Sequence, residues 1–218
     1  MRKSNSSRVP YRQLQAEETK RRIALAARRL FAEQGYARAS IAGVAEEAGV
    51  AVRTVYAAFG SKKAILAAIC DGWLVEAEIG SLIGQAIAEP DAGRRLAILA
   101  RLNRQQWERG TDVVALLEAA SASDLDVARM LAGWKAQRGE ALSQIVAGIA
   151  DQLASGLDVT TASAVVRGLS AAEVYEELVH GVGWSPDHYE QWLAGLLERE
   201  LLRVSRRTVS KRGAKASY

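Results

Sequence analysis

The chain has 218 residues, 49% hydrophobic and 25% charged, which is typical of a globular protein with one or two domains. Its longest uncharged runs, 79–88 and 141–150, are too short for a membrane span of roughly 18 apolar residues. Cys70 is the single cysteine, which excludes an intramolecular disulfide and a cysteine-cluster metal site. Because no apolar run of the signal-peptide type follows the basic N-terminus, we expect a cytoplasmic protein. We also expect no cofactor and no metal.

The charge is distributed unevenly along the chain. Residues 1–63 carry 13 Lys and Arg against 5 Asp and Glu, whereas residues 64–202 carry 10 against 20. Residues 203–218 add 6 basic residues and no acidic one. A basic N-terminal third on an acidic body predicts a module that faces nucleic acid, attached to a part that does not.

The N-terminal third predicts three short helices. Residues 1–14 are polar and basic and are expected to be a disordered arm. A first helix begins near Ala16 and ends at Gly35, since apolar residues recur on one face. That face consists of Ile23, Ala27, Leu30 and Phe31.

The second and third helices are separated by one glycine. Ser40 is a good N-cap for the second helix, and Gly49 suits the left-handed backbone of a tight turn. The third helix covers 51–58, and Ser61 caps a fourth. Helix, glycine turn, helix is the arrangement of a helix-turn-helix, which would make 51–58 the recognition helix in the major groove.

The outward side of that third helix carries the residues expected to contact DNA. Arg53 can donate two hydrogen bonds to a guanine, and the hydroxyls of Thr54 and Tyr56 suit phosphate oxygens. Lys62 and Lys63 lie in the first turn of the fourth helix, where free N–H groups already favour an anion. The alternative is structural, with Tyr56 a core aromatic and Arg53 merely exposed.

Residues 64–202 predict helices throughout, so the fold class is all-α, with about nine helices in total. One long amphipathic helix is expected through Val165 and Leu178, and another after Ser185-Pro186, where serine caps and proline occupies the first turn. Two adjacent helices with wide apolar faces would form half of a four-helix dimer bundle. The alternative is that both faces pack on their own domain.

Residues Phe31–Leu66 resemble the DNA-binding domain of TetR-type (tetracycline-repressor-like) transcriptional regulators. The motifs are Gly35-Tyr36, Ser40-Ile41-Ala42, Val44-Ala45-Glu46-Glu47-Ala48-Gly49-Val50, Thr54-Val55-Tyr56, Phe59 and Ser61-Lys62. The resemblance implies a DNA-binding domain over 15–63, a ligand-binding and dimerisation domain over 64–203, and leaves 204–218 as a disordered basic tail.

The resemblance also assigns roles to residues. It implies backbone contacts for Ser40, Thr54, Tyr56 and Lys62, and base-facing positions for Val52 and Arg53. Members commonly have serine or threonine where this chain has Ala51, which cannot cap the recognition helix. The last two helices are expected to make a homodimer through Val165, Leu169, Tyr189, Trp192, Leu193 and Leu196.

A small-molecule effector pocket is implied on the central helices. The candidate lining residues are Trp107, Leu116, Glu118, Met130, Trp134 and Gln137, a set that suits a hydrophobic or amphipathic ligand. The predicted function is a repressor that releases a palindromic operator in double-stranded DNA when the effector binds.

Two other classes of function compete with this one. An enzyme is disfavoured because the chain has two histidines, one cysteine and no glycine-rich phosphate loop, so that no catalytic constellation can be assembled. A non-specific DNA-packaging or membrane-surface protein would use the basic ends. Equal binding to a palindromic and a random duplex would favour that second class.

Overall fold

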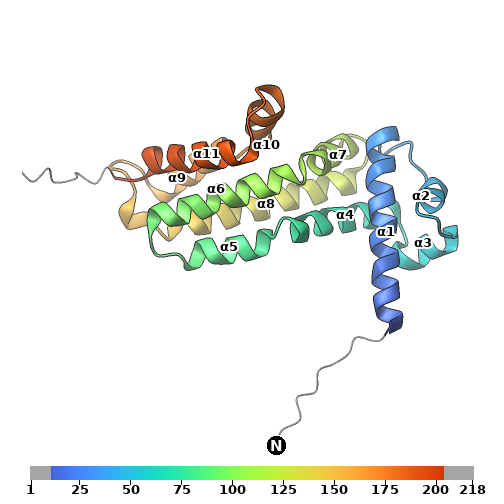
Figure 1. The fold of residues 1–218 in the computed structure, drawn as a ribbon. Coiled ribbons are helices and arrows are strands. Elements are labelled where there is room, and N and C mark those ends of the chain that lie inside the picture. Colours follow the sequence, from blue (N-terminus) through green and yellow to red (C-terminus); the bar gives the residue numbers. More distant parts are fainter. Residues whose placement is uncertain (1–10, 204–218) are drawn as a thin grey trace, which may run out of the picture.

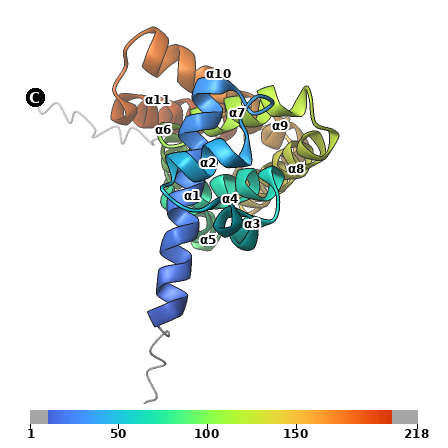
Figure 2. The ribbon, with the colours of Figure 1, turned by 90° about the vertical axis from the view of Figure 1, so that its right-hand side faces the viewer.

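The computed structural model describes residues 11–203, and its N-terminal unit is a small bundle (Figure 1). Helices α1 (Tyr11–Gln34), α2 (Ile41–Glu47) and α3 (Val52–Phe59) pack around the start of α4 (Lys62–Glu76). Figure 2 views this unit along the length of the molecule, with α2 and α3 facing the reader. Buried residues of all four helices make one core, and α4 continues out of it into the rest of the chain.

The remaining helices form an elongated body (Figure 1). They are α5 (Ile79–Ala88), α6 (Ala92–Glu108), α7 (Thr111–Ser121), α8 (Leu125–Ala147), α9 (Val159–Leu169), α10 (Ala172–Tyr175) and α11 (Pro186–Leu201), with a 3-10 turn η1 (Ala150–Gln152) and a π-helical turn η2 (Glu176–Gly181). Helix α6 packs against α5 on one side and α11 on the other, and α8 packs against α7 and α9. Between residues 11 and 203, no helix has the length and hydropathy of a membrane span.

The all-α prediction is confirmed, and three details differ from it. Eleven α-helices occur between residues 11 and 203, rather than about nine helices in all. Helix α1 begins at Tyr11, so 11–14 of the expected disordered arm are helical, while 1–10 and the expected tail 204–218 lie outside the described residues. The long helix expected through Val165 and Leu178 is wrong, because α9 ends at Leu169.

The break after α9 has a tertiary cause. Ser170 is fully buried, and its carbonyl accepts hydrogen bonds from the Trp107 indole (3.0 Å) and from Arg138 (2.6 Å). In a continuous helix this carbonyl would be taken by a backbone N–H four residues later. Because α9 ends before Ser170, the Ser170 carbonyl is free to accept hydrogen bonds from side chains of α6 and α8.

Trp73 fastens α4 to the body. Its side chain is 1% exposed, and its indole N–H donates to the carbonyl of Gln106 at 2.9 Å. The ring centroids of Trp107 and Trp134 lie 6.3 and 5.4 Å from that of Trp73. Gly110 closes the remaining side, where the Trp73 ring occupies the space that a Cβ would need. The absence of a side chain at Gly110 is thus what admits the indole.

Arg95 connects the C-terminal ends of α5 and α8. Its guanidinium donates to the carbonyls of Ile87 (3.0 Å), Glu89 (2.7 Å) and Ile145 (3.2 Å), at the C-terminal ends of α5 and α8. The negative ends of two helix dipoles thereby stabilise a charge that is 6% exposed. Gly148 lies so close to this guanidinium that a Cβ would overlap it.

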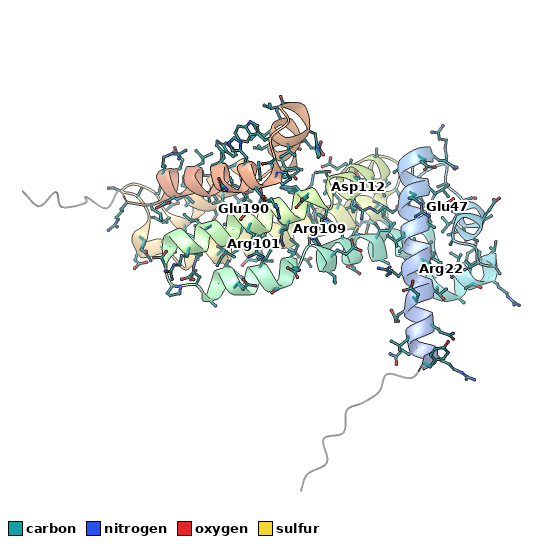
Figure 3. All side chains as sticks on the ribbon, viewed as in Figure 1. Arg22, Glu47, Arg101, Arg109, Asp112 and Glu190 are labelled. Carbon is teal, nitrogen blue, oxygen red and sulfur yellow. The ribbon has the colours of Figure 1, made fainter. Side chains whose placement is uncertain are left out.

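Polar side chains of the N-terminal unit contact the α7–α8 end of the body. Arg28 of α1 makes a two-pronged ion pair with Asp112 at the start of α7, with N–O distances of 2.7 and 2.5 Å. Lys63 pairs with Asp126 of α8 at 2.6 Å. The Tyr36 hydroxyl lies 3.5 Å from Asp124. Figure 3 shows Asp112 at the junction between α1 and α7.

The Trp73 contact generates a stability prediction. Gly110→Ala should lower the free energy of unfolding by about 1–3 kcal/mol, because the added methyl group must displace a fully packed indole. The measurement is urea unfolding followed by circular dichroism.

Gly133→Ala is the matched control, since Gly133 lies inside α8 with open space around it. There the same substitution should raise stability by roughly 0.5–1 kcal/mol through helix propensity. Equal effects at the two positions would contradict the account of Gly110.

Candidate nucleic-acid interface

The helix-turn-helix forms as its local signals predict. The Ser40 hydroxyl accepts from the Gly43 amide at 3.0 Å and caps α2. Gly49 has φ 63°, the left-handed conformation expected of the turn. The Val50 amide closes that turn on the Ala45 carbonyl at 2.9 Å. Helix α3 is therefore set at a fixed angle to α2 by backbone hydrogen bonds rather than by side-chain packing alone.

Helix α3 exposes most of the residues predicted to contact DNA. Val52 and Tyr56 are 41% and 54% exposed, which excludes the alternative that Tyr56 is a core aromatic. Arg53 is exposed and makes no hydrogen bond or ion pair with any of residues 11–203, while Thr54 is half-buried. Val55 is buried beneath them. The helix thus packs on the core through Val55, with Ala58 and Phe59 partly buried beside it, and presents its polar side outward.

The first turn of α3 lacks a side-chain cap, as predicted from Ala51. No side-chain atom accepts from its first amides, and the Thr54 amide instead bonds to the Ala51 carbonyl at 2.8 Å. An eight-residue helix without a cap is too short to be stable alone. Its order comes from its contacts with α1, α2 and α4.

Lys62 has protein partners that the sequence did not indicate. Its ammonium donates to the carbonyls of Tyr36 (2.6 Å), Ala37 (3.3 Å) and Ala39 (3.1 Å), and lies 4.4 Å from the centre of the Tyr36 ring. It therefore ties the start of α4 to the turn between α1 and α2. Its role as a phosphate contact stays a prediction, and the geometry assigns it a structural role as well.

Lys63 and two arginines of α1 are also partly engaged. The hydrogen bond and charge of Lys63 lower the pKa of Asp126. Arg29 pairs with Glu47 of α2 at 2.8 Å, and Arg22 donates to the Ala48 carbonyl at 3.0 Å. Figure 3 shows Arg22 and Glu47 on α1 and α2. Part of the positive charge counted in the N-terminal third thus holds the helices together.

Two cavities lie beside α8 where the effector pocket was expected. The inner cavity, about 150 Å³, is lined by Leu74, Ile79, Ile83, Leu102, Gln106, Trp134, Gln137, Arg138, Ala141 and Leu142. The outer cavity, about 260 Å³, lies across Arg138 and Trp134 from it and adds Trp107, Val114, Glu118, Lys135, Gly139, Arg167, Ala171, Ala172 and Glu173.

Four of the six residues predicted for the pocket line one of these cavities. They are Trp107, Glu118, Trp134 and Gln137. Leu116 is buried and Met130 half-buried, and neither lines the inner or the outer cavity. Arg138 was not predicted from the sequence as a lining residue. A charged residue on a predicted helix is expected to face solvent, and only the tertiary packing places it beside the cavities.

The predicted dimer residues divide into two groups. Tyr189 and Leu193 have no exposed surface, and the Tyr189 hydroxyl accepts from Asn103 at 2.6 Å, so both belong to the core of the single chain. Val165, Leu169, Trp192 and Leu196 are half-buried and keep some surface. Of the six predicted residues, only these four half-buried ones could therefore contact a partner subunit.

A comparison with protein families finds a match over the helix-turn-helix region. Residues 23–69 match the family model of bacterial regulatory proteins, tetR family. No curated protein sequence matches the chain. These residues contain α2, α3, the second half of α1 and about the first half of α4.

Solved structures extend the similarity to the whole fold. The SmeT–triclosan complex is 16% identical, with a TM-score of 0.71, over 92% of this chain and 100% of that one. NalD, the secondary repressor of the MexAB-OprM multidrug efflux pump in Pseudomonas aeruginosa, is 19% identical, with a TM-score of 0.65, over 87% and 99%.

FadR from Bacillus subtilis, in a complex with stearoyl-CoA, is 20% identical, with a TM-score of 0.64, over 81% of this chain and 96% of that one. The family model matches part of the N-terminal unit, and the solved structures match the fold of the chain. Residues 23–69 are therefore similar to the tetR family of bacterial regulatory proteins, and the chain shares the fold of these three structures.

Proposed function

We propose that this chain is a sequence-specific DNA-binding transcriptional regulator, a repressor that leaves a palindromic operator when a small molecule binds the body. The observation that carries the proposal is the exposed, unpaired Arg53 on the second helix of a helix-turn-helix. The structure gives it no partner among residues 11–203, whereas several neighbouring basic residues have one.

In this function α3 enters the major groove. Arg53 and Val52 face the bases, and Thr54 and Tyr56 face phosphates on either side. Ser40, Lys62 and Lys63 lie next to α3 on α2 and α4, where they would add contacts to the backbone. Since Ala51, Ala57 and Ala58 are small, base recognition depends on few side chains and on the shape of the DNA.

The regulator acts as a homodimer. Two copies of α3 must reach successive major grooves, roughly 34 Å apart, for a palindromic operator to be read. The half-buried residues of α9 and α11 are the proposed contact. The division into a DNA-binding domain over 15–63 and an effector and dimerisation domain over 64–203 is part of the same proposal.

The effector would bind in the cavities beside α8. Two similar proteins were solved with triclosan and with stearoyl-CoA, which share little chemistry beyond an apolar part. Neither identifies the ligand of this chain. Binding would favour a dimer geometry that no longer matches the operator, and the protein needs neither catalysis nor a membrane for this role. A cytoplasmic location, beside the DNA, is part of the proposal.

The role of Arg53 can be tested with an operator recovered by selecting genomic fragments on the purified protein. Arg53→Ala should weaken binding to that operator by about 5- to 150-fold, the equivalent of about 1–3 kcal/mol. Binding to a random duplex of the same length should fall much less. Fluorescence anisotropy at a fixed salt concentration measures both.

Arg94→Ala is the matched control, because Arg94 is exposed in the first turn of α6, at the end of the body far from α3 (Figure 1). It should change neither binding constant. An equal loss on both duplexes in Arg53→Ala would make Arg53 a phosphate contact. Equal binding of both duplexes by the unaltered protein, at every salt concentration, would instead support a packaging protein.

Lys62 should have two separable effects. Lys62→Ala removes three charge-assisted hydrogen bonds, so the free energy of unfolding should fall by about 1–3 kcal/mol. If Lys62 also contacts a phosphate, the slope of log K against log salt should flatten by about one. An unchanged slope with reduced stability would leave Lys62 a structural residue only.

A further inference from the structure

The inner cavity is apolar apart from three side chains. Its walls come from α4, α5, α6 and α8, and include Leu74, Ile83, Leu102 and Leu142. Among its lining residues, Arg138 is the one with a charge, and Gln106 and Gln137 are the other polar side chains. A cavity lined in this way suits a ligand with an apolar body and a single charged head group.

The charge of Arg138 has no acidic partner within ion-pair distance among residues 11–203. The guanidinium donates to the side-chain oxygens of Gln106 (3.3 Å) and Asn103 (3.0 Å) and to the Ser170 carbonyl (2.6 Å), all of them neutral. Its Nη1 donates to no atom of those residues. Burial lowers the pKa of Arg138 to about 10, so the group still carries its charge near neutral pH.

The nearby carboxylates do not neutralise this charge. Glu118, on the outer cavity, is paired with Lys135 at 2.8 Å. Glu173 raises the pKa of Arg138 through its charge, yet it is exposed and lies beyond ion-pair distance. A half-buried cation without a counter-ion loses part of its hydration, and an anion from outside the protein would compensate for that loss.

Arg95 shows how this fold satisfies a buried arginine when the role is structural. All three of its guanidinium nitrogens donate to carbonyls at helix C-termini, and it lines neither cavity beside α8. Arg138, in contrast, lies in the middle of α8, lines both cavities and has one such carbonyl, that of Ser170. The two arginines differ in what the fold leaves for a ligand to supply.

The partners of Arg138 are themselves fixed. The Asn103 amide donates to the buried Tyr189 hydroxyl at 2.6 Å, and the Ser170 carbonyl also accepts from the Trp107 indole. The Trp107 ring lies 5.0 Å from the guanidinium carbon. The guanidinium is therefore held in place before any ligand arrives, which favours recognition of a charged group.

We propose that Arg138 and the inner cavity form a binding site for an amphipathic anion, whose acidic head group pairs with Arg138 and whose apolar body fills the cavity. The proposal rests on the proposed function in naming this anion as the effector. Trp134 and Leu74 connect the site to α4, since Trp134 lies against Trp73 and Leu74 follows Trp73 in the chain.

Titration calorimetry on the full chain, without DNA, tests the site with four probes of equal chain length: octanoate, octyl phosphate, octanamide and octylamine. At one pH near 7 and one salt concentration, at least one of the anions should bind at least about tenfold more tightly than octanamide. Octylamine should bind most weakly. The tighter anion identifies the head group as a carboxylate or a phosphate.

Arg138→Gln should bring the two anions and octanamide within about twofold of one another. Arg167→Gln, on the outer cavity, is the matched control and should keep the preference for anions. Should Arg138→Gln fail to fold by circular dichroism, Ala141→Leu replaces it, because the larger side chain fills the inner cavity and should weaken octanoate and octanamide alike.

The proposal is overturned if octanamide or octylamine binds as tightly as the anions, if neither anion binds, or if Arg138→Gln keeps the preference. These outcomes are independent of operator binding, which is measured on the ligand-free protein. Octanoate or octyl phosphate that binds and releases the operator supports the effector role. Binding without release would retain the site and overturn that role.

Discussion

The packing of Trp73 between α6, α7 and α8 is the central apolar contact that joins the N-terminal unit to the body. Helix α4 starts among the helices of that unit and ends in the body, so its position determines where α3 points. The indole is hydrogen-bonded at its nitrogen, packed on two other tryptophans and enclosed by Gly110. A tightly packed interior resists gradual deformation, so α4 must move together with the groups that hold this ring.

The same region contains the cavities. Trp134 touches Trp73 and lines both the inner and the outer cavity, while Arg138 stands one helical turn further along α8. On the α7–α8 side, Asp112, Asp124 and Asp126 face Arg28, Tyr36 and Lys63 of the N-terminal unit. A change at the cavity thus has an apolar route through Trp73 and a polar route through these pairs. The carboxylates of Asp112 and Asp126 are about half exposed, so solvent screening makes the polar route the weaker one.

The N-terminal unit was predictable from sequence because its signals are local. Ser40, Gly49 and Ser61 each determine the backbone within three residues, and the structure has the cap or turn expected of each. Lys62 could not be assigned in this way, since its three carbonyl acceptors lie more than 20 residues earlier in the chain. The exposed face of α3 followed from helical periodicity alone.

In the body, periodicity shows that a helix has an apolar face and leaves open what covers it. Tyr189 and Leu193 were assigned to a dimer, yet α6 of the same chain covers them. The break at Ser170 was missed because its cause, the donors of Trp107 and Arg138, comes from other helices. Arg138 was missed for the same reason.

The close approach of Arg95 to Gly148 limits which substitutions related sequences can carry at these two positions. A side chain at Gly148 would occupy the space of the guanidinium, and loss of Arg95 would leave the helix-end carbonyls of Ile87, Glu89 and Ile145 without their donor. Neither substitution is easily accepted while the other position stays as it is. Across the lineage of this chain, the two positions should therefore covary, with arginine at one accompanying glycine at the other.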